Sequence, residues 1–123
     1  MLIDLADQMS LSRSGIHDGY IIGDNRDGFP VSIVTLDSIR EVNPPAFPYH
    51  NVVYAYGKVV FVGETKIQVV GEHDQIFILL PQKRCNFLIV EPRLSEQGIE
   101  LVVLSGCYSN HYYSIISVYG ICN

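Results

Sequence analysis

Histidine is the commonest metal ligand in proteins and a frequent proton-transfer group, and this chain contains four: His17, His50, His73 and His111. His17 and His73 are each followed directly by an aspartate, a further candidate ligand. A metal site usually includes a local pair of ligands, such as His-x-His on a strand or Glu-x-x-His on a helix. None of the four histidines has a second ligand at such a spacing. We therefore predict no metal site, and we expect no cofactor.

The three cysteines, Cys85, Cys107 and Cys122, are odd in number and widely spaced, without a Cys-x-x-Cys pair. A disulfide framework normally uses an even number of cysteines, and a zinc site uses closer pairs. We therefore expect three reduced thiols. The first residues include Asp4 and Asp7 and no basic segment, which is unlike a secretion signal, so we expect a cytoplasmic protein.

Local catalytic motifs are absent from the sequence. No serine lies in a Gly-x-Ser-x-Gly turn, and no glycine-rich phosphate loop occurs. Segment 24–28 is similar to a calcium loop, but Arg26 occupies a ligand position and no glutamate follows at the required spacing. The fold could still assemble an enzyme site from dispersed residues, namely His17, Asp18, Cys107 and His111. Because no local constellation is present, we favour a non-catalytic protein and keep the enzyme as an alternative.

The charge of the chain limits its partners. Eight Lys and Arg residues stand against thirteen Asp and Glu residues, which gives a formal net charge of -5. Nucleic-acid binding depends largely on clustered Lys and Arg, so this balance predicts no nucleic-acid partner. Uninterrupted apolar runs are only a few residues long, far short of the ~20 of a membrane helix, so we expect no membrane insertion. A basic protein partner fits this charge better.

Tyrosine is unusually frequent, with eight Tyr residues and no Trp. Exposed tyrosines at a hairpin tip make contacts at low entropic cost. We predict a partner-binding surface that combines such a tip with two acidic turn residues: Asp24, Asp27, Tyr108, Asn110, His111, Tyr112 and Tyr113. Local packing of the same tyrosines is the alternative. A small-ligand cavity lined by Tyr54, Tyr56 and Phe61 is a second possibility.

The elements that must position these residues are organised around residues 52–63, which are rich in β-branched and aromatic side chains. We predict a single central strand here. Alternation puts Val52, Tyr54 and Val60 on one face and Val53, Val59 and Phe61 on the other, so both faces are apolar and need cover. A partner subunit would supply that cover, and we therefore expect a homodimer. The alternative is that the N-terminal helix and the closing strands complete the cover within one chain, as a closed barrel permits.

Short apolar runs separated by turn residues predict further strands on both sides of the central one. We expect a short helix over 2–10, a hairpin of strands 16–23 and 30–40 around the turn 24–28, strands 66–70, 76–80 and 85–90, a polar connector 93–98, and strands 99–105 and 111–121 joined by the loop 106–110. The fold class is mainly β: a single domain over 1–123, an antiparallel sandwich or barrel of about eight strands. The predicted core is Val53, Val59, Phe61, Ile67, Val69, Ile76, Ile78, Leu101, Val103, Ile116 and Val118.

Residues 16–23 (Ile-His-Asp-Gly-Tyr-Ile-Ile-Gly) and the alternating strand that follows resemble small bacterial all-β proteins that open with an apolar-His-Asp hairpin, some of them linked to toxin-immunity loci. The resemblance covers residues 16–40, and segments 87–92 and 98–103 look like the same kind of domain. It implies a β fold and transfers no catalytic residue.

These observations predict a non-catalytic binding protein, an acidic inhibitor or immunity-type module that occludes a basic protein partner. The alternatives are a small-molecule-binding β-barrel and a small enzyme built from the dispersed His, Asp and Cys residues.

Overall fold

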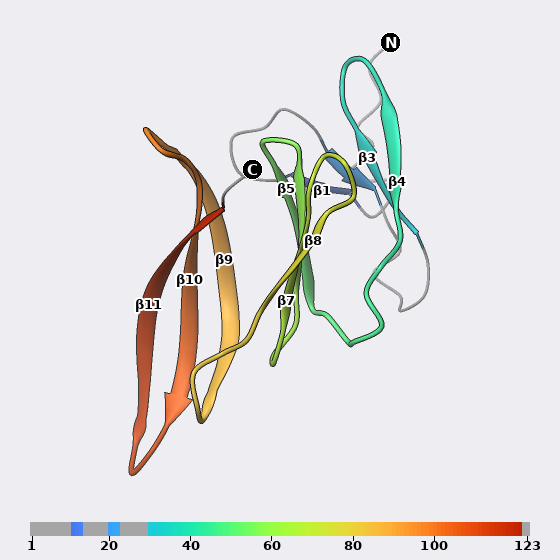
Figure 1. Ribbon diagram of the computed structural model, residues 1–123. Helices are drawn as coiled ribbons and strands as arrows, with labels where there is room; N and C mark the ends of the chain where they lie inside the picture. Colours follow the sequence, from blue (N-terminus) through green and yellow to red (C-terminus); the bar gives the residue numbers. More distant parts are fainter. Residues whose placement is uncertain (1–10, 14–19, 23–29, 122–123) are drawn as a thin grey trace.

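The computed structural model describes residues 11–13, 20–22 and 30–121, which form eleven strands in three antiparallel sheets (Figure 1). The first sheet contains β1 (Leu11–Arg13), β2 (Tyr20–Ile22), β3 (Val31–Val34) and β4 (Ile39–Val42). The second contains β5 (Asn51–Ala55), β6 (Lys58–Val62), β7 (Ile67–Val70) and β8 (Ile76–Leu79). The third contains β9 (Cys85–Ser95), β10 (Gly98–Tyr108) and β11 (Tyr112–Ile121). Each sheet is a meander of consecutive strands.

The predicted mainly β, antiparallel fold is confirmed. The described strands form three separate sheets rather than one sandwich or barrel of about eight strands. The strand expected over 30–40 is two strands, β3 and β4, because the chain turns at Thr35. The Thr35 hydroxyl accepts the Ser38 backbone N–H at 3.2 Å, and the Thr35 N–H donates to the Ser38 carbonyl at 2.9 Å. Such side-chain bonds compete with strand pairing. The helix expected over 2–10 lies outside the described residues.

The stretch expected as one central strand is a hairpin. Tyr56 and Gly57 have φ angles of 54° and 78°, so this two-residue connection has the left-handed conformation typical of tight hairpins. The reversal changes which side chains share a face: Val52 pairs with Phe61, and Val53 pairs with Val60. The predicted face assignment was therefore wrong beyond the turn, although both faces are apolar as expected.

The second sheet lies between the other two, and each of its faces forms a separate core (Figure 1). The core toward the first sheet contains Val31, Ile33, Val42, Val52, Tyr54, Val59, Phe61 and Val70. The core toward the third sheet contains Val53, Val60, Val62, Ile67, Val69, Phe87, Val90, Leu101 and Val103. The chain thus covers both faces of its central sheet by itself. A partner subunit is therefore not needed to cover this sheet, and the homodimer stays a prediction.

Four residues of the predicted core are exposed instead: Ile76, Ile78, Ile116 and Val118. The other seven are buried. Ile76 and Ile78 belong to β8, which is an edge strand of the second sheet. Ile116 and Val118 lie on the face of β11 that points away from the cores. Alternation places a side chain on a face, but it does not say whether another layer covers that face.

The third sheet is longer than expected. β9 continues to Ser95 through the segment expected as a connector, and only Glu96 and Gln97 separate it from β10. β10 continues to Tyr108, so the loop expected over 106–110 contains only residues 109–111.

Cys85 and Cys107 are direct partners on β9 and β10, and they form a disulfide. The prediction of reduced thiols was wrong for these two residues. Cys122 lies outside the described residues. Cysteines 22 positions apart gave no sign of pairing because their proximity depends on the register of a long hairpin.

No helix among the described parts of the chain is long and apolar enough to cross a membrane.

Candidate functional site

Arg40 of β4 reaches from the first sheet to two turns of the second sheet. One guanidinium nitrogen donates to the Gly57 carbonyl at 3.3 Å, in the β5–β6 turn. The other donates to the Gly71 carbonyl at 2.6 Å and to the Asp74 carboxylate at 3.1 Å, both in the β7–β8 connection. The planar guanidinium, with its fixed fork of donors, suits this convergence of acceptors. We call this set of contacts the Arg40 bridge.

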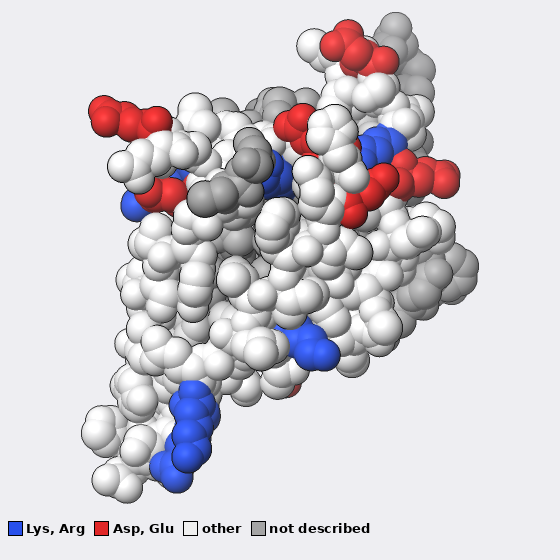
Figure 2. All heavy atoms as spheres, viewed as in Figure 1, with Lys and Arg blue, Asp and Glu red and all other residues white. Residues whose placement is uncertain are grey.

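Carboxylates surround the Arg40 bridge. Asp37, Glu41, Glu72 and Asp74 are all exposed, and they come from the turns and strand ends on both sides of Arg40. Lys58 is also near the β5–β6 turn, but it is 3% exposed and presents almost no charge to solvent. Figure 2 shows acidic side chains gathered toward the top of the view, near these turns. We call these four carboxylates and the Arg40 bridge the acidic end.

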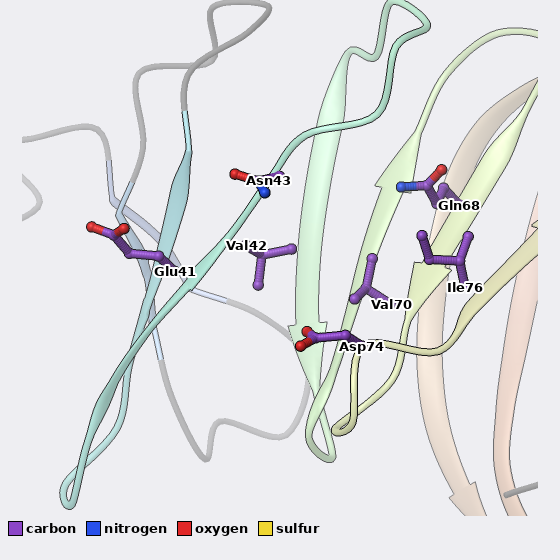
Figure 3. A pocket seen from close by; sticks show the side chains of 7 residues that line it. All are labelled: Glu41, Val42, Asn43, Gln68, Val70, Asp74 and Ile76. Carbon is purple, nitrogen blue, oxygen red and sulfur yellow. The ribbon is translucent and has the colours of Figure 1, made fainter.

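A groove of about 310 Å³ opens at the acidic end, between β4 and the β7–β8 hairpin (Figure 3). Val42 and Val70 lie on opposite sides of it, Ile76 extends its apolar lining, and the Asp74 carboxylate lies at one end. The remaining lining residues are Glu41, Asn43 and Gln68. In Figure 3 the Glu41 carboxylate points away from the apolar lining of the groove.

Two strand edges border this groove. β4 is the last strand of the first sheet, and β8 is the last strand of the second. An edge strand leaves every second backbone N–H and C=O without a ladder partner, and these groups can pair with an added strand. The groove therefore combines an apolar lining, backbone hydrogen-bonding groups and negative charge.

A second, more open hollow of about 590 Å³ lies on the other side of Arg40. Tyr54, Tyr56 and Gly57 line one part of it, and Asp37 and Glu72 add two carboxylates. The Tyr56 hydroxyl is buried and has no hydrogen-bond partner among the described residues.

The predicted small-ligand cavity is only partly formed. Tyr54 and Tyr56 line the open hollow, whereas Phe61 is fully buried in the core toward the first sheet. The Phe61 ring packs edge-on against Tyr49, with centroids 5.1 Å apart. These three residues therefore do not enclose a common cavity.

The predicted tyrosine tip is formed at the β10–β11 turn, where Tyr108, Asn110, His111, Tyr112 and Tyr113 are all exposed. The Tyr108 N–H donates to the Arg84 carbonyl at 3.0 Å, and Lys83 precedes Arg84. The tip is thus beside two basic residues. Asp24 and Asp27, the acidic members of the predicted surface, lie outside the described residues.

The structure describes two of the four residues of the alternative enzyme site, Cys107 and His111. Cys107 is bonded to Cys85 and is not available as a thiol nucleophile. His111 is exposed at the tyrosine tip, and His17 and Asp18 lie outside the described residues. Within the described ranges, no group of three or more His, Cys, Asp or Glu side chains could hold a metal ion.

The comparisons with known proteins give no relative. No family model, curated protein or solved structure matches this chain. The site must therefore be interpreted from its own geometry.

The acidic end was missed by sequence reasoning. Arg40 and Asp74 are 34 positions apart, and their contact depends on how the first sheet stacks on the second. The available signal was weak: acidic residues flank Arg40 at 37 and 41 and recur in the turn at 72 and 74.

Proposed function

We propose that this chain is a non-catalytic binding module that docks onto a basic segment of a protein partner. The observation that carries the proposal is the acidic end, where four exposed carboxylates surround the groove and the hollow. The only cation that lines either cavity, among the described residues, is Arg40, and it is already bonded to Gly57, Gly71 and Asp74. Negative potential at a concave surface attracts Lys and Arg side chains.

An extended segment fits the groove best. Added strands bind by main-chain hydrogen bonds to a free sheet edge, and alternate side chains then fill apolar pockets. The groove supplies the edges of β4 and β8 and an apolar lining in which Ile76 is exposed and Val42 and Val70 are largely buried. A Lys or Arg side chain can also lay its aliphatic part along such a lining and keep its charge near a carboxylate. The partner segment would alternate basic and apolar residues.

Occlusion of a basic partner agrees with the net charge of -5 and with the immunity-type resemblance of residues 16–40. The tyrosine tip is beside Lys83 and Arg84, so charge does not favour a basic partner there. We therefore assign the basic partner to the acidic end rather than to the tip.

The compartment is part of this proposal. Disulfides persist mainly in oxidising compartments, which argues against the cytoplasmic expectation. The Cys85–Cys107 disulfide favours a partner met in such a compartment.

Isothermal titration calorimetry with a synthetic peptide of alternating Lys and Val tests the proposal. A peptide of alternating Glu and Val serves as the control. We expect the Lys-Val peptide alone to bind, and we expect binding to weaken as salt rises, because exposed charges are screened within ~8 to 10 Å at physiological ionic strength.

Matched variants locate the binding. Glu41→Gln/Glu72→Gln removes two charges of the acidic end, and Glu91→Gln/Glu96→Gln removes two charges from the third sheet. Loss of peptide binding in the first variant alone supports the proposal. Equal binding of both peptides, or equal loss in both variants, would refute it. A small-molecule thermal shift that Tyr56→Phe abolishes would favour the small-ligand alternative instead.

A further inference from the structure

The outer face of the third sheet, opposite its core-facing side, is apolar and exposed. The strand registers put Cys107, Val103 and Leu101 of β10 toward the core, so the intervening positions of β10 and their partners point outward. Six large exposed side chains lie on this side: Leu88, Ile89, Tyr108, Tyr112, Ile116 and Val118. Ile116 is 70% exposed and Val118 is 51% exposed. We call this surface the outer face.

Tyr112 packs against the outer face at Gly106, which has no side chain. Gly106 of β10 lies between Asn86 and Ser114 in the sheet, and the ring end of Tyr112 occupies the space that a side chain at position 106 would need. Leu88 approaches the same space from the other side. The aromatic ring is therefore laid across the sheet rather than extended into solvent. A side chain ordered in this way loses less entropy when a partner covers it.

The outer face is large enough for a stable interface. The six side chains are 40 to 70% exposed, so together they reach the scale of the largest apolar patch of a typical monomer, which is roughly 300 to 600 Å². A standard interface buries roughly 800 Å² on each partner.

We propose that a second copy of this chain covers the outer face, so that two third sheets pack face to face around a two-fold axis. Two stacked sheets interdigitate their side chains at about 10 Å. Leu88, Ile89, Tyr108, Tyr112 and Ile116 form the uncharged part of the outer face, and Glu91 lies at its border, in the same cross-strand row as Val118. An uncharged patch is complementary to itself, which a two-fold interface requires. This contact uses a different surface from the acidic end and does not depend on the proposed function.

The charges at the two ends of the outer face determine the orientation. The half of the outer face nearer the β9–β10 turn carries Glu91, Glu96 and Glu100 against Arg93, which pairs with Glu100 at 2.8 Å. The opposite end carries Lys83 and Arg84. A two-fold axis perpendicular to the strands places Glu91 and Glu96 of one copy over the part of the other copy that carries Lys83 and Arg84. An axis parallel to the strands would place like charges together, so the perpendicular axis is favoured.

Sedimentation equilibrium of the full chain from about 1 to about 100 μM tests the dimer, since interfaces of this size have dissociation constants from micromolar downward. We expect twice the mass of one chain. Ile116→Glu should raise the dissociation constant by about tenfold or more, because it buries a charge in the contact. Leu36→Glu, at a wholly exposed position in the β3–β4 turn, should leave the dimer unchanged.

Circular dichroism checks that both variants stay folded, which is expected because both positions are exposed in a single chain. A wild-type protein that stays monomeric over this range, or a dimer that Ile116→Glu does not weaken, would overturn the proposal. A trimer would overturn the two-fold arrangement.

Charge reversal tests the orientation. Glu91→Lys/Glu96→Lys and Lys83→Glu/Arg84→Glu should each weaken the dimer, because each creates like charges across the interface. Combining all four changes should restore the dimer, because opposite charges again face each other across the interface. No restoration in the combined variant would rule out the perpendicular axis.

Discussion

The Arg40 guanidinium donates to the Gly71 carbonyl at 2.6 Å, which joins the edge strand of the first sheet to a turn of the second. Gly71 is buried, and its N–H donates to the Gln75 carbonyl at 2.8 Å, so the same residue also closes the β7–β8 connection. One side chain thus holds the groove and the hollow in their relative positions.

Arg40→Met should lower the free energy of unfolding by about 1.5 to 3 kcal/mol, because it removes charged hydrogen bonds at a side chain that is 26% exposed. Urea unfolding measures the change. Arg93→Met is the matched control, since the Arg93–Glu100 pair involves an arginine side chain that is 57% exposed and should contribute at most about 1 kcal/mol. Equal losses in the two variants would contradict a bridging role for Arg40.

Gly63→Ala should destabilise the fold by about 1 to 3 kcal/mol, because an added methyl group would meet the Pro48 and Lys66 carbonyls of the backbone, which cannot move aside easily. Gly120→Ala is the control, since nothing lies within 4 Å of the added atom. Thermal unfolding followed by circular dichroism compares the two. A loss as large at position 120 as at position 63 would show that steric crowding is not the cause.

The sequence predicts individual strands of this fold but not, for every strand, which face is buried. The β-branched run 66–70 and the alternation of Leu101 and Val103 predicted strands and buried residues correctly, because burial on one face leaves a period of two. Ile116 has the same pattern as Val103 and is exposed. The difference depends on the stacking order of three sheets, which local periodicity does not contain.

The candidate site was less predictable than the strands. The tyrosine tip follows from one hairpin, so the sequence predicted its grouping, whereas the acidic end joins turns from two stacked sheets. The Tyr56–Gly57 turn was also missed, because Tyr rarely takes a positive φ and so gave no turn signal. The predicted role of Asp24 and Asp27 in partner binding stays a prediction, because both lie outside the described residues.

Gly106→Ala should weaken the proposed dimer without unfolding the chain. The added methyl group would meet the ring end of Tyr112 and the tip of Leu88, both of which are side-chain ends that can move. Displacement of Tyr112 would roughen the outer face and should raise the dissociation constant by about tenfold, the usual scale for losing an aromatic anchor. Sedimentation equilibrium gives the constant, and Tyr112→Ala should give a similar change. If both variants have the dissociation constant of the wild type, Tyr112 is not part of the dimer interface.

Removing the Cys85–Cys107 disulfide should destabilise the third sheet. Closing a loop of this length contributes about 3 kcal/mol by restricting the unfolded chain, so Cys85→Ser/Cys107→Ser should lower the free energy of unfolding by roughly that amount. Cys122→Ser is the control and should change it little. Urea unfolding of the oxidised protein, with and without dithiothreitol, gives an independent measure.

Alkylation of the thiols followed by mass spectrometry tests the pairing itself. In unfolded but unreduced protein from an oxidising compartment, Cys85 and Cys107 should not react, and after reduction both should react. If all three thiols react before reduction, Cys85 and Cys107 do not form a disulfide in the purified protein. That result would restore the cytoplasmic expectation, because the disulfide is the observation that favours an oxidising compartment.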